Sequence, residues 1–365
     1  PGVCGLLLPR VSALLATARC QPIGGASERR AAGCHHHLLP QLMAEELFTG
    51  LIGQGQATAL LSAALEFQRL APAYLFCGPD GVGRSMAARR FLEGVIAGPS
   101  GSPSVRRRLE EGNHPDLLWV EPTYSDKGQL VPASQALAAG ISRKAPPQLR
   151  LEQVRAVSQF LGRRPVEASR CLVVIEAVEA MAEGAANALL KTLEEPGNGL
   201  LILLSAAPDR LLSTIRSRCQ AIPFARLAPE PLQRVLAAQP SASQPDPPEL
   251  LELAAGSPGA VLEHRQQWHA LPEGLAQRCA ALIGSMPQPV SPLAALSLAR
   301  DLCDALEVEQ QLWLLDWWQL HLWRQCCDPR QQQRLQTLRR QLRAYVQPRL
   351  AWEVALLDLS GAAGA

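Results

Sequence analysis

The sequence predicts an α/β protein with a parallel sheet, followed by a small helical domain and an all-α C-terminal domain. Two continuously apolar runs, residues 171–175 and 200–204, are separated by a helical stretch that ends at Glu194-Glu195-Pro196-Gly197. Short apolar runs joined by a helix are typical of a βαβ unit in a sheet that is covered on both faces. The pattern of residues 275–359 is helical throughout, which predicts the C-terminal domain.

The helix between the two apolar runs has one apolar stripe and a clear end. Its apolar residues recur at intervals of three and four: Ala182, Ala185, Ala186, Leu189, Leu190 and Leu193. This spacing predicts a helix with one face buried against the sheet. Pro196 ends the helix because proline has no N–H and clashes with the preceding turn. Since functional groups of parallel sheets lie at the carboxyl ends of strands, Glu176 and Ser205 are candidate site residues.

A glycine-rich loop follows the first predicted strand, residues 73–77. It reads Gly78-Pro79-Asp80-Gly81-Val82-Gly83-Arg84-Ser85, and a helical pattern at residues 86–96 comes directly after it. Strand, loop and helix in this order are the context of a phosphate-binding P-loop, whose glycines let backbone N–H groups point at phosphate oxygens. Arg84 stands where the motif has lysine, and a planar guanidinium does not replace a compact ammonium. The loop is therefore either a nucleotide site or a P-loop kept for packing.

Two polar segments before the central unit have simple interpretations. The run Arg106-Arg107-Arg108, next to Glu110 and Glu111, indicates a solvated helix face rather than a DNA contact. Residues 112–116 have the composition of a turn, and we expect His114 to make a local hydrogen bond rather than to bind a ligand.

The other elements follow from hydrophobic periodicity and turn residues. We expect a strand at residues 117–120, helices at 47–70, 151–161, 229–238 and 250–255, and loop with a short helix at 123–146. Ile222-Pro223-Phe224 should be an edge strand, because proline cannot donate to a central ladder. Residues 312–323 are leucine and tryptophan on almost every side, so several neighbours must bury this helix. Core packing explains the pattern, and an oligomerisation collar is the functional alternative.

Composition narrows the classes of function. The chain of 365 residues has a formal net charge of +2, so any DNA contact would need a local basic patch. No apolar run approaches the roughly 18 residues of a membrane span. The ten cysteines include no Cys-x-x-Cys pair, so neither a zinc ribbon nor a disulfide framework is indicated. We expect a reducing, cytoplasmic setting and no metal site.

Five motifs in order resemble the bacterial clamp-loader branch of the AAA+ family. They are Leu51-Ile52-Gly53-Gln54, residues 78–85, residues 112–116, residues 185–196 and Thr214-Ile215-Arg216-Ser217-Arg218-Cys219. The resemblance covers residues 47–265, and residues 275–359 only as a helical collar. It implies a RecA-like α/β domain, a helical lid and a collar, assembled in a heteropentameric ring that loads a sliding clamp onto primed DNA. The implied partners are loader subunits of the gamma/tau and delta types, the clamp and primer-template DNA, with no membrane.

With this resemblance the chain divides into five segments. Residues 43–228 form the P-loop domain, 229–270 the lid, 271–359 the collar and 360–365 a disordered tail. Residues 1–42 contain four arginines, one acid and the run His35-His36-His37. We expect this segment to be translated upstream sequence, a transit-type presequence or a disordered arm.

The resemblance also implies roles for single residues. Arg218 matches the arginine finger that reaches ATP on a neighbouring subunit, although a surface ion pair is the alternative. Glu176 and Ala177 occupy the Walker B pair, Ser205 lies in the sensor 1 region, and Gly259 falls near the sensor 2 arginine. Ala177 has no proton acceptor, and general-base help is worth roughly 10²–10⁴-fold in rate.

The resemblance implies a subunit of the DNA-directed DNA polymerase holoenzyme, and these departures predict that it is largely non-catalytic, with a degenerate P-loop site. Whether that site still holds ATP or ADP with Mg²⁺ stays open. The first alternative is an active, gamma/tau-like ATPase subunit that uses Arg84 and Glu176 in unusual roles. The second is a P-loop nucleoside or nucleotide kinase, which would leave Ser217-Arg218-Cys219 unexplained.

Overall fold

The computed structural model describes residues 47–126, 128–136, 146–239, 247–284, 291–344 and 346–359. The expected N-terminal arm at residues 1–42 and the expected tail at residues 360–365 lie outside these described residues. Among the described helices, none has both the length and the apolar character needed to cross a membrane.

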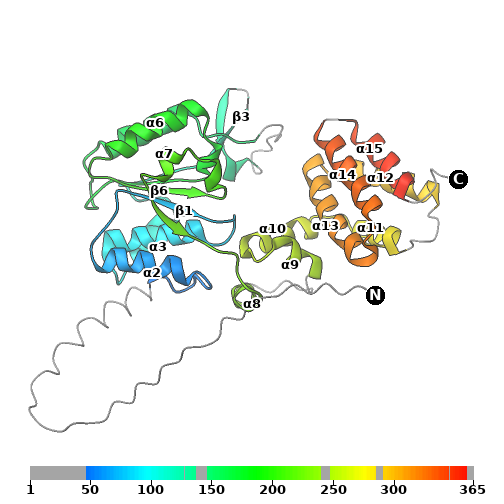
Figure 1. Cartoon of the computed structure of the whole chain (residues 1–365), viewed down its shortest axis with the longest axis horizontal. Coiled ribbons are helices and arrows are strands. Elements are labelled where there is room, and N and C mark those ends of the chain that lie inside the picture. Colours follow the sequence, from blue (N-terminus) through cyan, green and yellow to red (C-terminus); the bar gives the residue numbers. More distant parts are fainter. Residues whose placement is uncertain are drawn as a thin grey trace, which may run out of the picture. The chain divides into compact units, whose positions relative to one another are not determined.

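A five-stranded sheet forms the centre of the α/β region (Figure 1). Its strands lie in the order β2 (Leu117–Val120), β5 (Leu172–Ile175), β6 (Leu200–Ser205), β1 (Ala73–Cys77) and β7 (Gln220–Pro223). Every pairing in this sheet is parallel. The predicted βαβ unit is confirmed, since β5 and β6 are neighbours joined by α6 (Glu183–Glu194). The predicted edge position of β7, whose last residue is Pro223, is confirmed as well.

Helices cover both faces of the sheet because successive strand residues point to opposite sides. Phe76 and Ile202 belong to a core that includes side chains of α2 (Gly55–Glu66) and α3 (Arg84–Ala97). Leu75 and Val173 belong to a second core with α5 (Leu151–Leu161) and α6. Figure 1 shows α2 and α3 on one side of the sheet, and α6 and α7 (Ser213–Arg216) on the other.

The structure corrects two of the expected elements. The helix expected at residues 47–70 is shorter, because Gly50 and Gly53 take φ angles of +102° and +82° and α2 begins only at Gly55. At residues 123–146 we expected loop and short helix, but part of this segment is an antiparallel hairpin of β3 (Thr123–Asp126) and β4 (Gln129–Pro132). Neither strand has the continuous apolar run that identified β2 and β5, which are equally short.

The chain after β7 is helical, as predicted. The helices are α8 (Pro229–Ala237), α9 (Pro248–Ala254), α10 (Pro258–His269), α11 (Leu275–Gly284), α12 (Pro292–Ala305), α13 (Val308–Cys326), α14 (Pro329–Arg343) and α15 (Pro348–Leu359). The apolar segment at residues 312–323 lies in α13, where Leu315 and Trp318 are fully buried among side chains of α12, α14 and α15. The predicted core packing of this helix is therefore confirmed.

Candidate functional site

Three strands bring the predicted site residues to one edge of the sheet. In the register, Cys77 at the end of β1 lies beside Ser205, and Ile175 at the end of β5 lies beside Leu203. The P-loop leaves the sheet after Cys77, and Glu176 leaves it after Ile175. The carboxyl ends of parallel strands thus place the loop and Glu176 on either side of β6, which is the usual position of a ligand site in such sheets.

The glycines of the P-loop meet two kinds of constraint. Gly81 and Gly83 have left-handed φ angles of +73° and +101°, which favour glycine. A Cβ at Gly78 would lie 2.3 Å from the carbonyl oxygen of Phe224. The loop leads into α3, whose first-turn N–H groups have no acceptor within the helix. The backbone therefore keeps the general form of an anion cradle.

Arg84, at the lysine position of the motif, is held by the loop itself. Its guanidinium forms an ion pair with Asp80, four residues earlier. The Arg84 side chain is only 10% exposed, and its buried Nη1 has no hydrogen-bond partner among the described residues. The Asp80 carboxylate is 86% exposed, so solvent screens this pair and it offsets only part of the Arg84 charge.

The Glu176 carboxylate, at the Walker B position, already accepts two hydrogen bonds from the protein. Ser85 Oγ donates to Glu176 Oε1 over 3.2 Å, and Trp119 Nε1 donates to the same oxygen over 3.0 Å. Trp119 lies in β2, which pairs with β5, and the Arg89 guanidinium lies over its ring at 4.4 Å from the centroid. Sequence reasoning missed Trp119. A tryptophan near the end of a strand beside Glu176 is the signal that could have identified it.

The two neighbouring positions supply no free catalytic group. Ala177 has no carboxylate, and its φ of +46° is left-handed. Ser205 is fully buried, and its Oγ accepts the N–H of Ala207 over 3.2 Å. The Ser205 carbonyl accepts the N–H of Gly78 over 3.1 Å, so this residue ties the sheet to the P-loop.

The N-terminus of α10 packs directly against the P-loop. Gly259 donates its N–H to the Gly81 carbonyl over 2.9 Å, and Ser257 Oγ donates to the Asp80 carbonyl over 2.6 Å. A Cβ at Gly259 would lie 2.6 Å from Gly81 Cα, and a Cβ at Gly81 would lie 2.8 Å from Gly259 Cα. This contact therefore requires glycine on both sides. Gly259, near the sensor 2 position, carries no side chain that could reach a phosphate.

These contacts test whether the residues present fit ATP with Mg²⁺. Mg²⁺ demands octahedral oxygen ligands at about 2.0–2.1 Å. Ser85 and Glu176, which would supply such oxygens, are hydrogen-bonded to each other, and the Trp119 N–H takes the same carboxylate oxygen. Ala177 adds no general base, and Gly259 contacts the loop. The residues therefore do not fit a site that hydrolyses ATP with a general base of its own, and no catalytic step is assigned to it.

Arg218 lies at the surface, in the segment that follows α7. Its Nη2 donates to Glu194 Oε1 over 2.9 Å, and its Nη1 donates to the Thr214 carbonyl over 3.0 Å. The side chain is 37% exposed. Its backbone is anchored by the fully buried Ile215 and by Cys219, whose thiol pKa burial raises to about 12. The surface ion pair that the sequence left open is present, and the guanidinium stays accessible.

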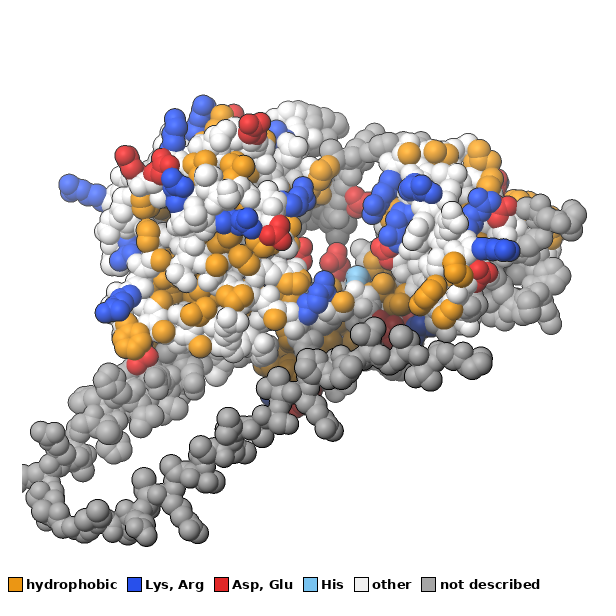
Figure 2. Space-filling model, in the orientation of Figure 1, with side chains coloured by type: hydrophobic (Ala, Val, Ile, Leu, Met, Phe, Trp, Pro, Cys, Tyr) orange, Lys and Arg blue, Asp and Glu red, His pale blue; other side chains and the backbone are white. Residues whose placement is uncertain are grey.

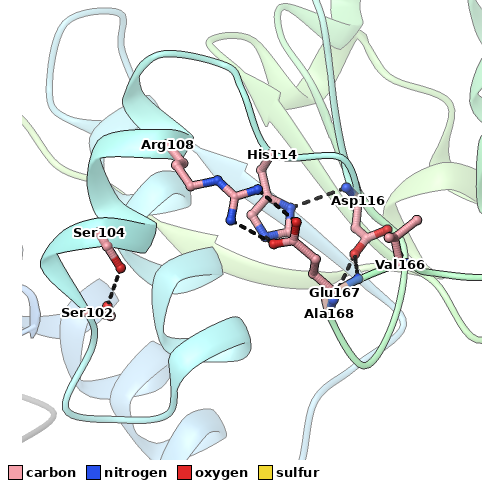
Figure 3. Close-up of polar contacts among 8 residues, drawn as sticks. All are labelled: Ser102, Ser104, Arg108, His114, Asp116, Val166, Glu167 and Ala168. Carbon is pink, nitrogen blue, oxygen red and sulfur yellow. Dashed lines mark hydrogen bonds and ion pairs between the residues drawn. The ribbon is translucent and has the colours of Figure 1, made fainter.

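The motif at residues 112–116 lies at the amino end of β2, away from this site (Figure 3). His114 Nδ1 accepts the N–H of Asp116 over 3.2 Å, so the predicted local hydrogen bond is confirmed. Burial opposes ionisation of Asp116, but N–H bonds from residues 166–168 outweigh it and hold the Asp116 pKa below its usual value. Burial, followed by the Arg108 charge, lowers the pKa of His114. The motif fastens residues 166–168 to the sheet.

Charged side chains outside the site are largely paired or interspersed. In α4 (Pro103–Glu110), Arg106 pairs with Glu93 and Arg108 with Glu167, which favours the predicted helix face over a DNA contact. Figure 2 shows positive and negative side chains mixed over the face drawn. Among the described residues, no group of three His, Cys, Asp or Glu side chains is arranged to hold a metal ion.

Two family models match consecutive parts of the chain. The model described as DNA polymerase III, delta subunit, matches residues 53–228. The model described as cyanobacterial DNA polymerase III delta prime, C-terminal domain, matches residues 230–359. Together they span both the α/β region and the helices that follow it.

The chain spans about half the length of two curated delta' relatives and about a quarter of a tau/gamma relative. DNA polymerase III subunit delta' of Pseudomonas aeruginosa is 36% identical over 199 residues, which are 52% of this chain and 54% of that protein. The Bacillus subtilis subunit delta' is 33% identical over 186 residues, 49% of this chain and 50% of that protein. The Haemophilus influenzae subunit tau/gamma is 29% identical over 191 residues, 50% of this chain and 24% of that protein.

A solved structure supports the fold. It is a crystal structure of a DNA polymerase III, gamma subunit-related protein from Thermotoga maritima, with a TM-score of 0.52 and 17% identity. The match covers 84% of this chain and 99% of that one. At this identity the likeness shows the fold alone.

Proposed function

The chain belongs to the DNA polymerase III delta-prime family, and from this membership we propose that it is a largely non-catalytic subunit of a clamp loader. In this role it helps to load a sliding clamp onto primed DNA. Its own P-loop site does not turn over ATP, and Arg218 serves as an arginine finger for ATP bound to a neighbouring subunit. The contrast between Arg84, paired inside its own loop, and the exposed Arg218 carries the proposal.

The chemistry of an arginine finger suits the surroundings of Arg218. During phosphoryl transfer, negative charge spreads over the phosphoryl oxygens, and a guanidinium presented from outside the site stabilises it. The effect is worth roughly 10³–10⁵-fold in kcat, or about 4–7 kcal/mol of transition-state stabilisation. Such a group needs an exposed guanidinium on a firmly anchored backbone. Ile215 and Cys219 supply that anchor on the two sides of Arg218.

The proposed partners follow from the same role. They are gamma/tau-type and delta-type loader subunits in a heteropentameric ring, the sliding clamp and primer-template DNA. The setting is the cytoplasm, where replication proteins of bacteria act. DNA polymerase activity belongs to the holoenzyme, to which this chain contributes no polymerase site of its own.

The alternative of an active, gamma/tau-like ATPase subunit agrees less well with the site. Such a subunit needs a base to activate water, and Ala177 has none. The kinase alternative does not account for the arginine segment.

A substitution of Arg218 in the reconstituted clamp loader tests the proposal. Arg218→Ala should lower the DNA- and clamp-stimulated ATPase rate by about 10³-fold or more. Arg216→Ala is the matched control, since Arg216 is similarly exposed at 42% and pairs with the exposed Asp209. The control should keep most of the rate, and thermal unfolding should show both variants folded. A loader that carries Arg218→Ala and still hydrolyses ATP at the wild-type rate would contradict the proposal.

A further inference from the structure

The Arg218 guanidinium is held by acceptors from two different helices. Nη1 donates to the Thr214 carbonyl of α7, and Nη2 donates to Glu194 Oε1 at the end of α6. Thr214 is only four residues away, whereas Glu194 is 24 residues away in the sequence. The direction of the guanidinium is thus set by a second element and not by its own turn alone.

The end of α6 gives Glu194 a firm base. Thr192 and Leu193, directly before it, are each only 7% exposed. The N–H of Glu195 bonds back to the Lys191 carbonyl over 3.1 Å, and the helix ends before Pro196. The Glu194 carboxylate therefore projects from a packed helix end, although the side chain itself is 53% exposed.

The neighbouring ion pair lacks such support. Arg216 Nη1 bonds to Asp209 Oδ1 over 3.0 Å, and Asp209 is 95% exposed. Asp209 lies in a turn of only three residues, Pro208–Arg210. Two arginines of one segment thus have acidic partners, but only the partner of Arg218 belongs to a long, packed helix.

We propose that Glu194 is a positioning residue for Arg218, an inference that rests on the proposed arginine-finger role. A guanidinium carries five N–H donors, and the bonds to Glu194 and Thr214 use two of them. Three donors remain for phosphate oxygens of a neighbouring subunit. Glu194 fixes the orientation of the guanidinium before the two subunits meet, so less freedom is lost when the finger engages.

The exposure of the Arg218–Glu194 pair argues against an inhibitory role, in which Glu194 would keep Arg218 from the nucleotide. Exposed ion pairs are weak and are screened by salt. A triphosphate carries more negative charge than one carboxylate, so Glu194 orients Arg218 without competing strongly for it. Glu194 touches no reacting atom in this arrangement.

A double-mutant cycle in the reconstituted loader tests the inference. Glu194→Ala should lower kcat for DNA-stimulated ATP hydrolysis by about 10-fold with little change in KM, because the finger is then poorly aligned. In the Arg218→Ala background the same change should lower the rate no further, since Glu194 acts through the guanidinium. Glu194→Gln keeps an acceptor oxygen and should recover most of the rate. Release of radiolabelled phosphate over long incubations resolves the slow variants.

Glu195→Ala is the matched control, because it removes the adjacent carboxylate, which forms no hydrogen bond or ion pair among the described residues. It should leave the rate within about twofold of wild type, as surface substitutions usually do. Equal losses from Glu194→Ala in both backgrounds would indicate a purely structural role and overturn the inference, as would a Glu194→Ala loader as fast as wild type or faster. If Arg218→Ala alone leaves the rate intact, the arginine-finger function fails. If Arg218→Ala is slow while Glu194→Ala is normal, only the positioning role fails.

Discussion

The P-loop and the arginine segment differ in where their polar groups are directed. In the P-loop, Arg84 is paired with Asp80, and Gly81 contacts Gly259. In the arginine segment, the backbone lies between the buried Ile215 and the half-buried Cys219, while the Arg218 side chain stays 37% exposed. The Arg84 side chain is 10% exposed and lies against its own loop, whereas Arg218 presents a charged group to the outside. A subunit that assists a neighbouring active site needs the second arrangement and not the first.

Under the proposed function, the comparison accounts for a P-loop that persists without ATP turnover. Buried polar groups must find hydrogen-bond partners, so a site that binds no ligand is stable only if the protein supplies those partners. Trp119 supplies one to Glu176, and Ser257 supplies one to the Asp80 carbonyl. We therefore expect contacts within the protein to occupy the positions that a nucleotide would take at the P-loop. Three experiments test this expectation, in order of decreasing expected effect.

The largest effect expected is on ATP turnover. The isolated chain should hydrolyse ATP at least about 10²-fold more slowly than the assembled loader, because Ala177 offers no general base. Ala177→Glu should not close this gap, since Ser85 and Trp119 still hold Glu176. Phosphate release by the isolated variants measures both rates, with Ala177→Gln as an uncharged control of equal size. A hundredfold higher ATP hydrolysis rate in Ala177→Glu would mean that the P-loop site lacks only a general base. The difference drawn above between the P-loop and the arginine segment would then be wrong.

The next effect concerns the contact between α10 and the P-loop. Gly259→Ala places a Cβ about where the backbone of Gly81 lies, at 2.6 Å from its Cα, so one of the two segments must shift. We expect a loss of about 1–3 kcal/mol in the free energy of unfolding, as for other overpacked sites. Urea denaturation measures it, and hydrogen exchange should show weaker protection around residues 257–261.

Gly184→Ala is the control for this experiment. Gly184 lies in α6, and a Cβ there would meet no atom within 4 Å. Alanine should therefore stabilise the chain slightly, by about 0.4–1 kcal/mol. If Gly259→Ala changed the free energy of unfolding no more than Gly184→Ala does, α10 would not pack tightly against the P-loop. The difference drawn between the P-loop and the arginine segment would then lose its structural basis.

The elements that could be predicted from the sequence depend on local patterns. The glycine spacing after β1 and the apolar stripe of α6 are such patterns, and the predicted bounds of residues 151–161 agree with α5. Departures from the motif, such as Arg84 and Ala177, are also visible in the sequence. The hairpin of β3 and β4 was missed because its strands lack the continuous apolar run that identified β2 and β5.

The partners of the site residues could not be predicted, because they come from distant segments. Trp119 is 57 residues from Glu176, and Ser257 is 177 residues from Asp80. Such contacts depend on strand order and on the packing of α10, which hydrophobic periodicity does not determine. The sequence therefore shows the departures at Arg84 and Ala177, and the structure adds the contacts that the neighbouring residues make.

The smallest expected effect comes from Trp119. Trp119→Phe keeps an aromatic ring under Arg89 but removes the N–H that donates to Glu176 Oε1. We expect a loss of about 1 kcal/mol in the free energy of unfolding, because Ser85 still donates to the same oxygen. Urea denaturation with and without Mg²⁺ measures the loss, and Trp323→Phe at a 49% exposed position is the control. Two results together would make Glu176 a metal ligand: Mg²⁺ raises the free energy of unfolding of the wild-type chain, and Trp119→Phe does not lower that free energy. The P-loop would then resemble a working site.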